Sequence, residues 1–215
     1  MTGESVLVSA SGGIGRIELS RPVKRNAIDN ASALRITQAL ATFADDPECR
    51  GVVLLGTGGD LSSGADLKDP SGAAPGAPSP RTAMLTAIAD CPLPVVSVVD
   101  GWAIGLGVAM AAASYATVVT DRAKFRLPEA AMGMFPFAVV PYLTGRMRPH
   151  EIADLVLTGR TVTAPEALRL GLASAHATPG EGETMAAAIL AAATRPPRAV
   201  VTETLAWLRR EMGAL

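Results

Sequence analysis

The chain has 215 residues, of which 49% are hydrophobic and 18% are charged, and its formal net charge is −1 at pH 7. This composition excludes an intrinsically disordered protein, and the length fits one domain with a helical appendage. Because Lys and Arg are scattered and show no excess, a nucleic-acid-binding surface is not expected. Cys49 and Cys91 lack metal-ligand spacing, which predicts reduced thiols in a cytoplasmic protein with no metal site.

A membrane partner is not expected either. Twenty uncharged residues separate Asp100 from Asp121, and this length would span a bilayer. The stretch is poor in Leu, Ile and Phe, however, and no flanking Lys or Arg would orient it. The N-terminal ten residues lack a basic start before an apolar core, so no signal peptide is expected.

The first 120 residues alternate between strand and helix patterns. Gly12-Gly13 separates two short alternating segments, which favours a hairpin, and Asp29 or Asn30 can cap a following helix. Continuous apolar runs farther along predict strands that are buried on both faces. The predicted strands are 6–10, 14–19, 51–57, 94–99 and 116–120, and the predicted helices are 30–43, 81–89 and 105–114. This order predicts a layered α/β fold.

The character of the sequence changes near Pro149. Helical patterns dominate from there to the C-terminus, at 151–157, 164–170, 183–193 and 197–212. The chain therefore divides into an α/β core over residues 1–148 and a helical region over residues 149–215. Residues 69–80 are rich in Pro, Gly, Ser and Ala and are predicted to form a loop.

Three glycine-containing stretches are candidates for chemistry. The first, Ser11 to Gly15, precedes a strand pattern and not a helix, so it is interpreted as a turn and not as a dinucleotide site. The second, Gly58 to Lys68, and the third, Asp100 to Ala109, each follow a predicted buried strand. A glycine turn at such a point leaves backbone N–H groups unpaired, and two such turns can form an oxyanion hole. Close helix–sheet packing is the alternative reason for these glycines.

Together and in this order, the motifs of the chain resemble the crotonase (enoyl-CoA hydratase/isomerase) superfamily. The resemblance begins with Arg21-Pro-Val-Lys-Arg-Asn-Ala27 and covers nearly the whole chain. The other matching segments are 62–68, 94–101, 123–129, 157–160 and 164–172. The resemblance implies a spiral of β-β-α turns, followed by a helical region used for trimerisation. It also implies assembly as a homotrimer or a dimer of trimers.

The resemblance also implies an acyl-CoA thioester as substrate, with coenzyme A as part of it and no further cofactor. The two backbone donors to the thioester oxygen would be the N–H groups of Ala65 and Leu106, where Leu106 replaces the usual glycine. This replacement requires that Leu adopt the necessary backbone angles. The segments expected to border the substrate and its CoA contain Lys24, Arg25, Ala27, Ser63, Asp66, Leu67 and Lys68.

The candidate acid–base residue is Glu129, which follows Leu127-Pro128. Apolar residues surround it in the sequence, which predicts a raised carboxyl pKa. Hydratases of this family use two glutamates, but the position of the first is Ala109 here. One carboxylate can move a proton between two carbons, so a double-bond shift is preferred over hydration.

Several alternatives remain open. A hydratase would need a substitute carboxylate, for which Asp66, Asp100 and Asp121 are candidates. A non-catalytic acyl-CoA-binding protein is compatible with Ala109, Leu106 and the short C-terminal region. A serine hydrolase of the same spiral fold would need Ser at position 106, which argues against that class. His150 and His176 have no suitably spaced nucleophile and are not expected to be catalytic.

Overall fold

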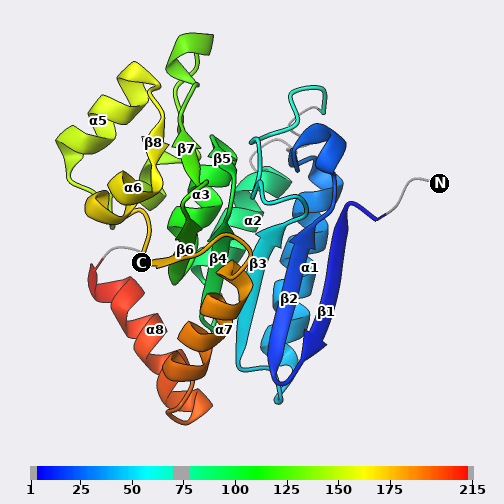
Figure 1. Cartoon of the computed structure of the whole chain (residues 1–215). Coiled ribbons are helices and arrows are strands. Elements are labelled where there is room, and N and C mark those ends of the chain that lie inside the picture. Colours follow the sequence, from blue (N-terminus) through cyan, green and yellow to red (C-terminus); the bar gives the residue numbers. More distant parts are fainter. Residues whose placement is uncertain (1–3, 70–77, 213–215) are drawn as a thin grey trace.

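The computed structural model describes residues 4–69 and 78–212 and contains a six-stranded sheet, a three-stranded sheet and the helices that cover them (Figure 1). Most of the loop predicted over residues 69–80 lies outside the described residues. No helix within the described part of the chain has the length and hydropathy needed to cross a bilayer.

Five of the six strands of the large sheet lie at predicted positions. Its first two strands, β1 (Val6–Ser11) and β2 (Ile14–Leu19), are antiparallel and turn at Gly12 and Gly13, which have φ of +59° and +78°. All later neighbours are parallel, in the order β1-β2-β3-β4-β6-β9. The later strands are β3 (Gly51–Gly56), β4 (Val95–Val99), β6 (Ala116–Thr120) and β9 (Ala175–Ala177).

Helices cover both faces of this sheet, because alternate residues of its parallel strands point to opposite sides. Val52 and Leu54 belong to the larger core cluster, together with residues of α1 (Asn30–Asp45), α2 (Pro80–Ala89) and α3 (Leu106–Ala113). Val53 belongs to a smaller cluster, which it shares with Leu190 of α7 (Gly182–Ala193). Figure 1 shows α7 and α1 on opposite sides of the sheet.

The second sheet consists of three short strands, β5 (Trp102–Ile104), β7 (Lys124–Arg126) and β8 (Val162–Thr163). The C-terminal part contains the predicted helices as α5 (Pro149–Thr158), α6 (Ala164–Leu170), α7 and α8 (Arg198–Met212), which follow the four-residue α4 (Val140–Leu143). It also supplies β8 and β9 to the two sheets, and neither strand was predicted. Strands of two or three residues are too short to show a detectable alternation.

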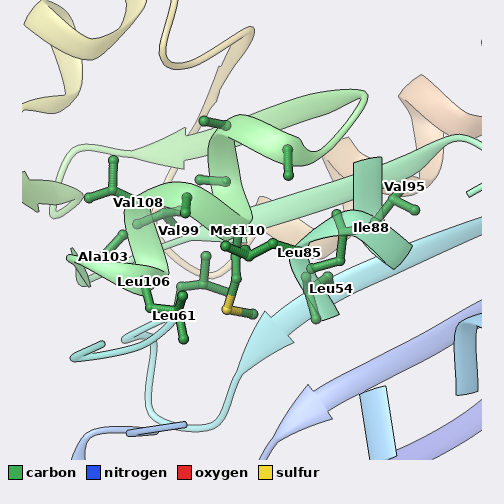
Figure 2. Close-up of a cluster of buried hydrophobic side chains, with 14 of the residues drawn as sticks. Leu54, Leu61, Leu85, Ile88, Val95, Val99, Ala103, Leu106, Val108 and Met110 are labelled. Atoms are coloured by element: carbon green, nitrogen blue, oxygen red, sulfur yellow. The ribbon is translucent and has the colours of Figure 1, made fainter. Parts of the chain in front are cut away.

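The core beneath the third glycine stretch, Asp100 to Ala109, orients α3. Leu106, the first residue of α3, is 7% exposed and belongs to the same buried cluster as Leu61 and Met110 (Figure 2). Every residue of α3 is buried. The helix is therefore held on all sides, and its first turn has a defined position.

Candidate active site

The two glycine turns predicted to form an oxyanion hole lie side by side. Ser62 bridges to Ala103 and Ala65 bridges to Ile28, which joins three distant segments in parallel pairs. A Cβ built on Gly64 would lie 3.0 Å from the carbonyl oxygen of Ile104 and 3.7 Å from the nitrogen of Leu106. The φ of Gly64 is +100°, so glycine is required both for this close approach and for the backbone conformation.

Three backbone N–H groups that adjoin Ala65 and Leu106, those of Gly64, Asp66 and Gly105, are engaged. Gly64 N–H donates to the Ser62 hydroxyl at 3.0 Å, and Asp66 N–H donates to the Ile28 carbonyl at 2.8 Å. Gly105 N–H donates to the carbonyl of Arg126 at 2.9 Å. Among the hydrogen bonds of residues 4–69 and 78–212, none is donated by the N–H of Ala65 or of Leu106. The Leu106 N–H belongs to the first turn of α3, where N–H groups have no intrahelical partner, so both N–H groups are candidate ligand donors.

Leu106 adopts its position without backbone strain. Gly105, directly before α3, takes the unusual conformation, with φ +51° and ψ −112°. Among the described residues, only Arg25 and Asn26 are non-glycine residues with positive φ, so Leu106 is not one of them. The replacement of the usual glycine therefore preserves the N–H group, and the Leu side chain points into the core.

Glu129 lies beside these donors. A Cβ built on Gly105 would be 2.6 Å from Oε1 of Glu129. Its Oε2 is buried and has no hydrogen-bond partner among the described residues. Burial raises the pKa of the Glu129 carboxyl above its ordinary value, as predicted.

Hydrogen bonds of the residues before and after Glu129 hold its segment in position. Arg126, at the end of β7, donates from Nε to the carbonyl of Gly159 at 2.8 Å. After Glu129, the N–H groups of Met132 and Met134 both donate to its carbonyl, at 3.0 and 2.9 Å. The turn that these bonds close includes Gly133 in the left-handed conformation.

A pocket of about 360 Å³ connects the donors and the carboxyl group. Its described lining includes Ser63, Ala65, Leu106 and Glu129 and is otherwise apolar. Glu129 is the one titratable side chain among these lining residues. Residues 70–77 contain no Asp or Glu, and neither do the other residues outside the description, so no further acidic side chain of this chain is left unplaced.

The carboxylates considered as substitutes for a second glutamate are engaged elsewhere. Asp66 pairs with Lys24 at 2.8 Å and with Arg21 at 3.0 Å, and these two cations lower its carboxyl pKa. Asp100 accepts hydrogen bonds from Arg122 and Thr120. Asp121 lies 2.7 Å from the ring of His176. None of the three lines the pocket, and Ala109 is fully buried in α3.

The residues predicted to border CoA have varied environments. Lys24 and Arg25 are half-exposed, and the Arg25 side chain reaches Asp60 at 2.8 Å. Ser63 and Leu67 line the pocket, and Leu67 is 71% exposed. Ala27 is buried, while Lys68 is exposed and its N–H donates to Asp66 at 3.2 Å.

Asn26 was not among the predicted site residues. Its buried amide accepts from Arg21 N–H at 2.9 Å and donates to the carbonyls of Thr57 and Asp60 at 3.1 and 2.7 Å. It therefore connects the turn after β2 to the turn after β3, which carries the first donor. The left-handed φ of Asn26 could not be deduced from the sequence pattern.

The described residues contain no group of three His, Cys, Asp or Glu side chains arranged to hold a metal ion. His150 and His176 do not line the pocket. The chemistry available at this site is therefore that of two backbone donors, one carboxyl group with a raised pKa, and an apolar surround.

Known proteins resemble this chain in sequence. The sequence profile of the enoyl-CoA hydratase/isomerase family matches residues 9–206. The carnitinyl-CoA dehydratase of Salmonella arizonae is 38% identical over 183 residues, which cover 83% of this chain and 70% of that protein. The enzyme of the same name from Salmonella enteritidis is 39% identical over 174 residues, covering 79% of this chain and 66% of that protein. The chain thus spans 66–70% of the length of these curated relatives.

Solved structures share the fold. Pseudomonas aeruginosa AtuE superposes with a TM-score of 0.88 at 30% identity, over 97% of this chain and 84% of AtuE. An enoyl-CoA hydratase from Mycobacterium avium subsp. paratuberculosis K-10 gives a TM-score of 0.88 at 26% identity, over 97% and 85% of the two chains. The profile match, the relatives and the fold agree: this chain belongs to the enoyl-CoA hydratase/isomerase family of the crotonase superfamily.

Proposed function

We propose that this chain shifts the double bond of an enoyl-CoA thioester by way of an enolate. The thioester oxygen would accept hydrogen bonds from the N–H groups of Ala65 and Leu106, and Glu129 would be the acid–base residue. One observation carries the proposal. A single titratable side chain, with its buried Oε2 unpartnered, lines a pocket beside two N–H groups that have no protein acceptor among the described residues.

The proposed reaction conserves protons and electrons. The Glu129 carboxylate removes a proton from C2 of a 3-enoyl thioester, and the C–H electron pair delocalises onto the thioester oxygen. The two N–H groups stabilise this negative charge. The Glu129 carboxylic acid then returns the proton to C4, the carbonyl re-forms, and the product has a C2–C3 double bond.

A raised carboxyl pKa suits both halves of this cycle. A base that is hard to ionise is also a stronger proton acceptor once ionised. Because the reaction moves one proton and changes no oxidation state, the proposal includes no cofactor besides the CoA of the substrate. Lys24, Arg25 and Lys68 are proposed to meet its phosphates, with Ala27, Ser63, Asp66 and Leu67 forming the adjoining wall. A homotrimer or a dimer of trimers is proposed as the assembly.

Hydration or dehydration is the second candidate. The curated relatives are named carnitinyl-CoA dehydratase, and this name favours a lyase. Adding water across C2–C3 requires a group that activates water at C3 while another manages the proton at C2. The absence of a second carboxylate from the described lining of the pocket favours the isomerase over this candidate.

The first experiment measures exchange of the α-proton of butyryl-CoA and octanoyl-CoA in deuterated water, by mass spectrometry, for the wild type and Glu129→Gln. We expect exchange in the wild type and its loss in the variant. The products of 2-enoyl-CoA and 3-enoyl-CoA are then analysed in ¹⁸O-labelled water. Conversion of 3-enoyl to 2-enoyl without label supports the isomerase, and a labelled 3-hydroxyacyl product supports the hydratase.

A non-catalytic role has its own signature. CoA thioesters would bind, as measured by calorimetry, but no acyl-CoA would exchange its α-proton. That result would contradict the proposed chemistry and favour an acyl-CoA-binding protein.

A further inference from the structure

One wall of the active-site pocket consists of large apolar side chains that are left exposed. Met132, Met134, Phe135 and Phe137 follow Glu129 in the chain, and all four line the pocket. Their exposed fractions are 50%, 43%, 55% and 78%. Exposed apolar side chains scattered singly need no explanation, but a contiguous group around a pocket indicates a binding surface.

This wall has a defined shape. The Phe135 and Phe137 rings lie 4.3 Å apart at an interplanar angle of 57°. Phe137 N–H donates to the Phe135 carbonyl at 2.9 Å, and Val139 N–H donates to the Pro136 carbonyl at 2.9 Å. Val139 is buried, while the other end of the wall is tied to the Glu129 carbonyl. The ring pair is therefore held next to the site and not on a loose loop.

The charge of the wall limits what it can bind. Glu129 is the one charged side chain in the described lining, and it is assigned to the proton transfer. No second anion of that lining could pair with a cationic acyl group, and no cation could pair with an acidic one. Two phenylalanines and two methionines match a flexible apolar chain, since Met adapts to irregular shapes.

We propose that this chain is selective for acyl groups with an apolar tail longer than butyryl, and that Phe135 and Phe137 determine this selectivity. The inference rests on the proposed function. With the thioester oxygen at the two donors and C2 at Glu129, the rest of the acyl chain continues along the segment that follows Glu129. The wall then covers the tail, and the tail covers the exposed rings.

The test uses α-proton exchange, which does not depend on the final product. We expect kcat/KM to rise about two- to fourfold per added methylene from butyryl-CoA to octanoyl-CoA, as the burial of each methylene contributes to binding. Phe135→Ala and Phe137→Ala should each lower the octanoyl to butyryl ratio about tenfold, because a half-covered ring is lost. Leu157→Ala is the matched control, since Leu157 is 76% exposed and lies on α5 outside the pocket lining.

A second pair of probes separates apolar from cationic tails. 4-(Trimethylammonio)butanoyl-CoA and 5,5-dimethylhexanoyl-CoA have the same shape and differ by one charge. We expect the neutral compound to exchange faster. Because aromatic faces also attract quaternary ammonium groups, a faster reaction of the charged compound would overturn the proposal and indicate a cation site at the two rings.

The outcomes distinguish the two proposals. If no acyl-CoA exchanges in the wild type, the proposed function itself fails. If exchange depends on Glu129 but is the same for butyryl-CoA and octanoyl-CoA, only the selectivity is wrong. A third outcome is an exchange rate that does not depend on acyl-chain length, together with a changed sedimentation coefficient in Phe137→Ala. This result would show that a second copy of the chain covers the rings, which also contradicts the inference.

Discussion

The carboxyl group of Glu129 lies against the α-carbon of Gly105, so that a Cβ built on Gly105 would meet Oε1 at 2.6 Å. Gly105 also has a positive φ, which side chains rarely adopt. The same glycine therefore starts α3, directs the Leu106 N–H away from the protein's own acceptors, and leaves space for the acid–base group.

Gly105→Ala is expected to lower the rate of α-proton exchange by about 10²-fold or more, because the methyl group displaces the Glu129 carboxyl group. Gly12→Ala is the matched control. Gly12 has φ +59°, and a Cβ built on it would meet nothing within 4 Å. The Gly12→Ala substitution therefore introduces backbone strain far from the pocket and no steric clash. Both variants should lose thermal stability, and only Gly105→Ala should lose exchange activity per folded molecule. Equal activities would show that Gly105 does not set the position of Glu129.

The second donor can be removed with a single substitution. Leu106 is the first residue of α3, a position where proline is tolerated because the N–H has no intrahelical partner. Leu106→Pro should therefore keep the helix but lose the donor, with a fall in exchange rate of about 10²–10³-fold. Leu106→Ala removes the same buried side chain and keeps the N–H.

Leu106→Ala is expected to be less stable than the wild type by about 2–5 kcal/mol, because it leaves a cavity in the core. Its exchange rate per folded molecule should stay within a few-fold of the wild type. Urea unfolding and single-turnover exchange measure the two effects separately. If Ala and Pro at this position were equally slow, the Leu106 N–H would not be the donor.

The raised pKa of Glu129 predicts how stability depends on pH. The folded protein holds the Glu129 proton more tightly than the unfolded chain does. Ionisation of this carboxyl group therefore lowers the free energy of unfolding as the pH rises from its ordinary pKa to its raised pKa in the folded protein. Glu129→Gln carries no such charge. Its melting temperature should therefore exceed that of the wild type at pH 7, and the difference should shrink on lowering the pH to 4.

The same ionisation should govern the rate. Exchange in the wild type should decline as the pH falls through the raised pKa of Glu129, because only the carboxylate accepts the proton. Differential scanning calorimetry and exchange at matched pH values test both statements. A difference in melting temperature that grows towards acid pH would contradict the raised pKa of this carboxyl group.

The far end of α3 is held by Arg146, which has no carboxylate partner among the described residues. Its Nε donates to the Ala112 carbonyl at 2.7 Å, and its Nη2 donates to Ser114. Arg146→Met should lower the free energy of unfolding by about 2 kcal/mol, as expected for hydrogen bonds from a charged group. Arg148→Met is the control, because Arg148 is exposed and its one salt bridge within the described part of the chain is to Glu151. A smaller loss for Arg146→Met than for the control would contradict this capping role.

Much of the fold follows from local patterns. The Gly12-Gly13 hairpin, the buried strands β3, β4 and β6, and most helix boundaries match their predicted positions within a few residues. These elements have strong signals because a run of apolar residues, a cap or a pair of glycines acts over a few neighbouring positions. The short strands β5, β7, β8 and β9 were missed, since pairing with distant residues decides whether two or three residues form a strand.

For the candidate site, the two glycine turns and Glu129 could be proposed from the sequence, because each lies within one continuous segment that resembles a motif of the family. Only the tertiary structure decided which side chains share the pocket. It placed Asp66 in a pair with Lys24, left Ala65 and Leu106 with N–H groups not used in the described part of the protein, and brought Phe135 and Phe137 to the pocket wall. The reason is physical: periodicity records which face of an element is buried, whereas hydrogen-bond partners and pocket walls depend on how segments far apart in the chain pack together.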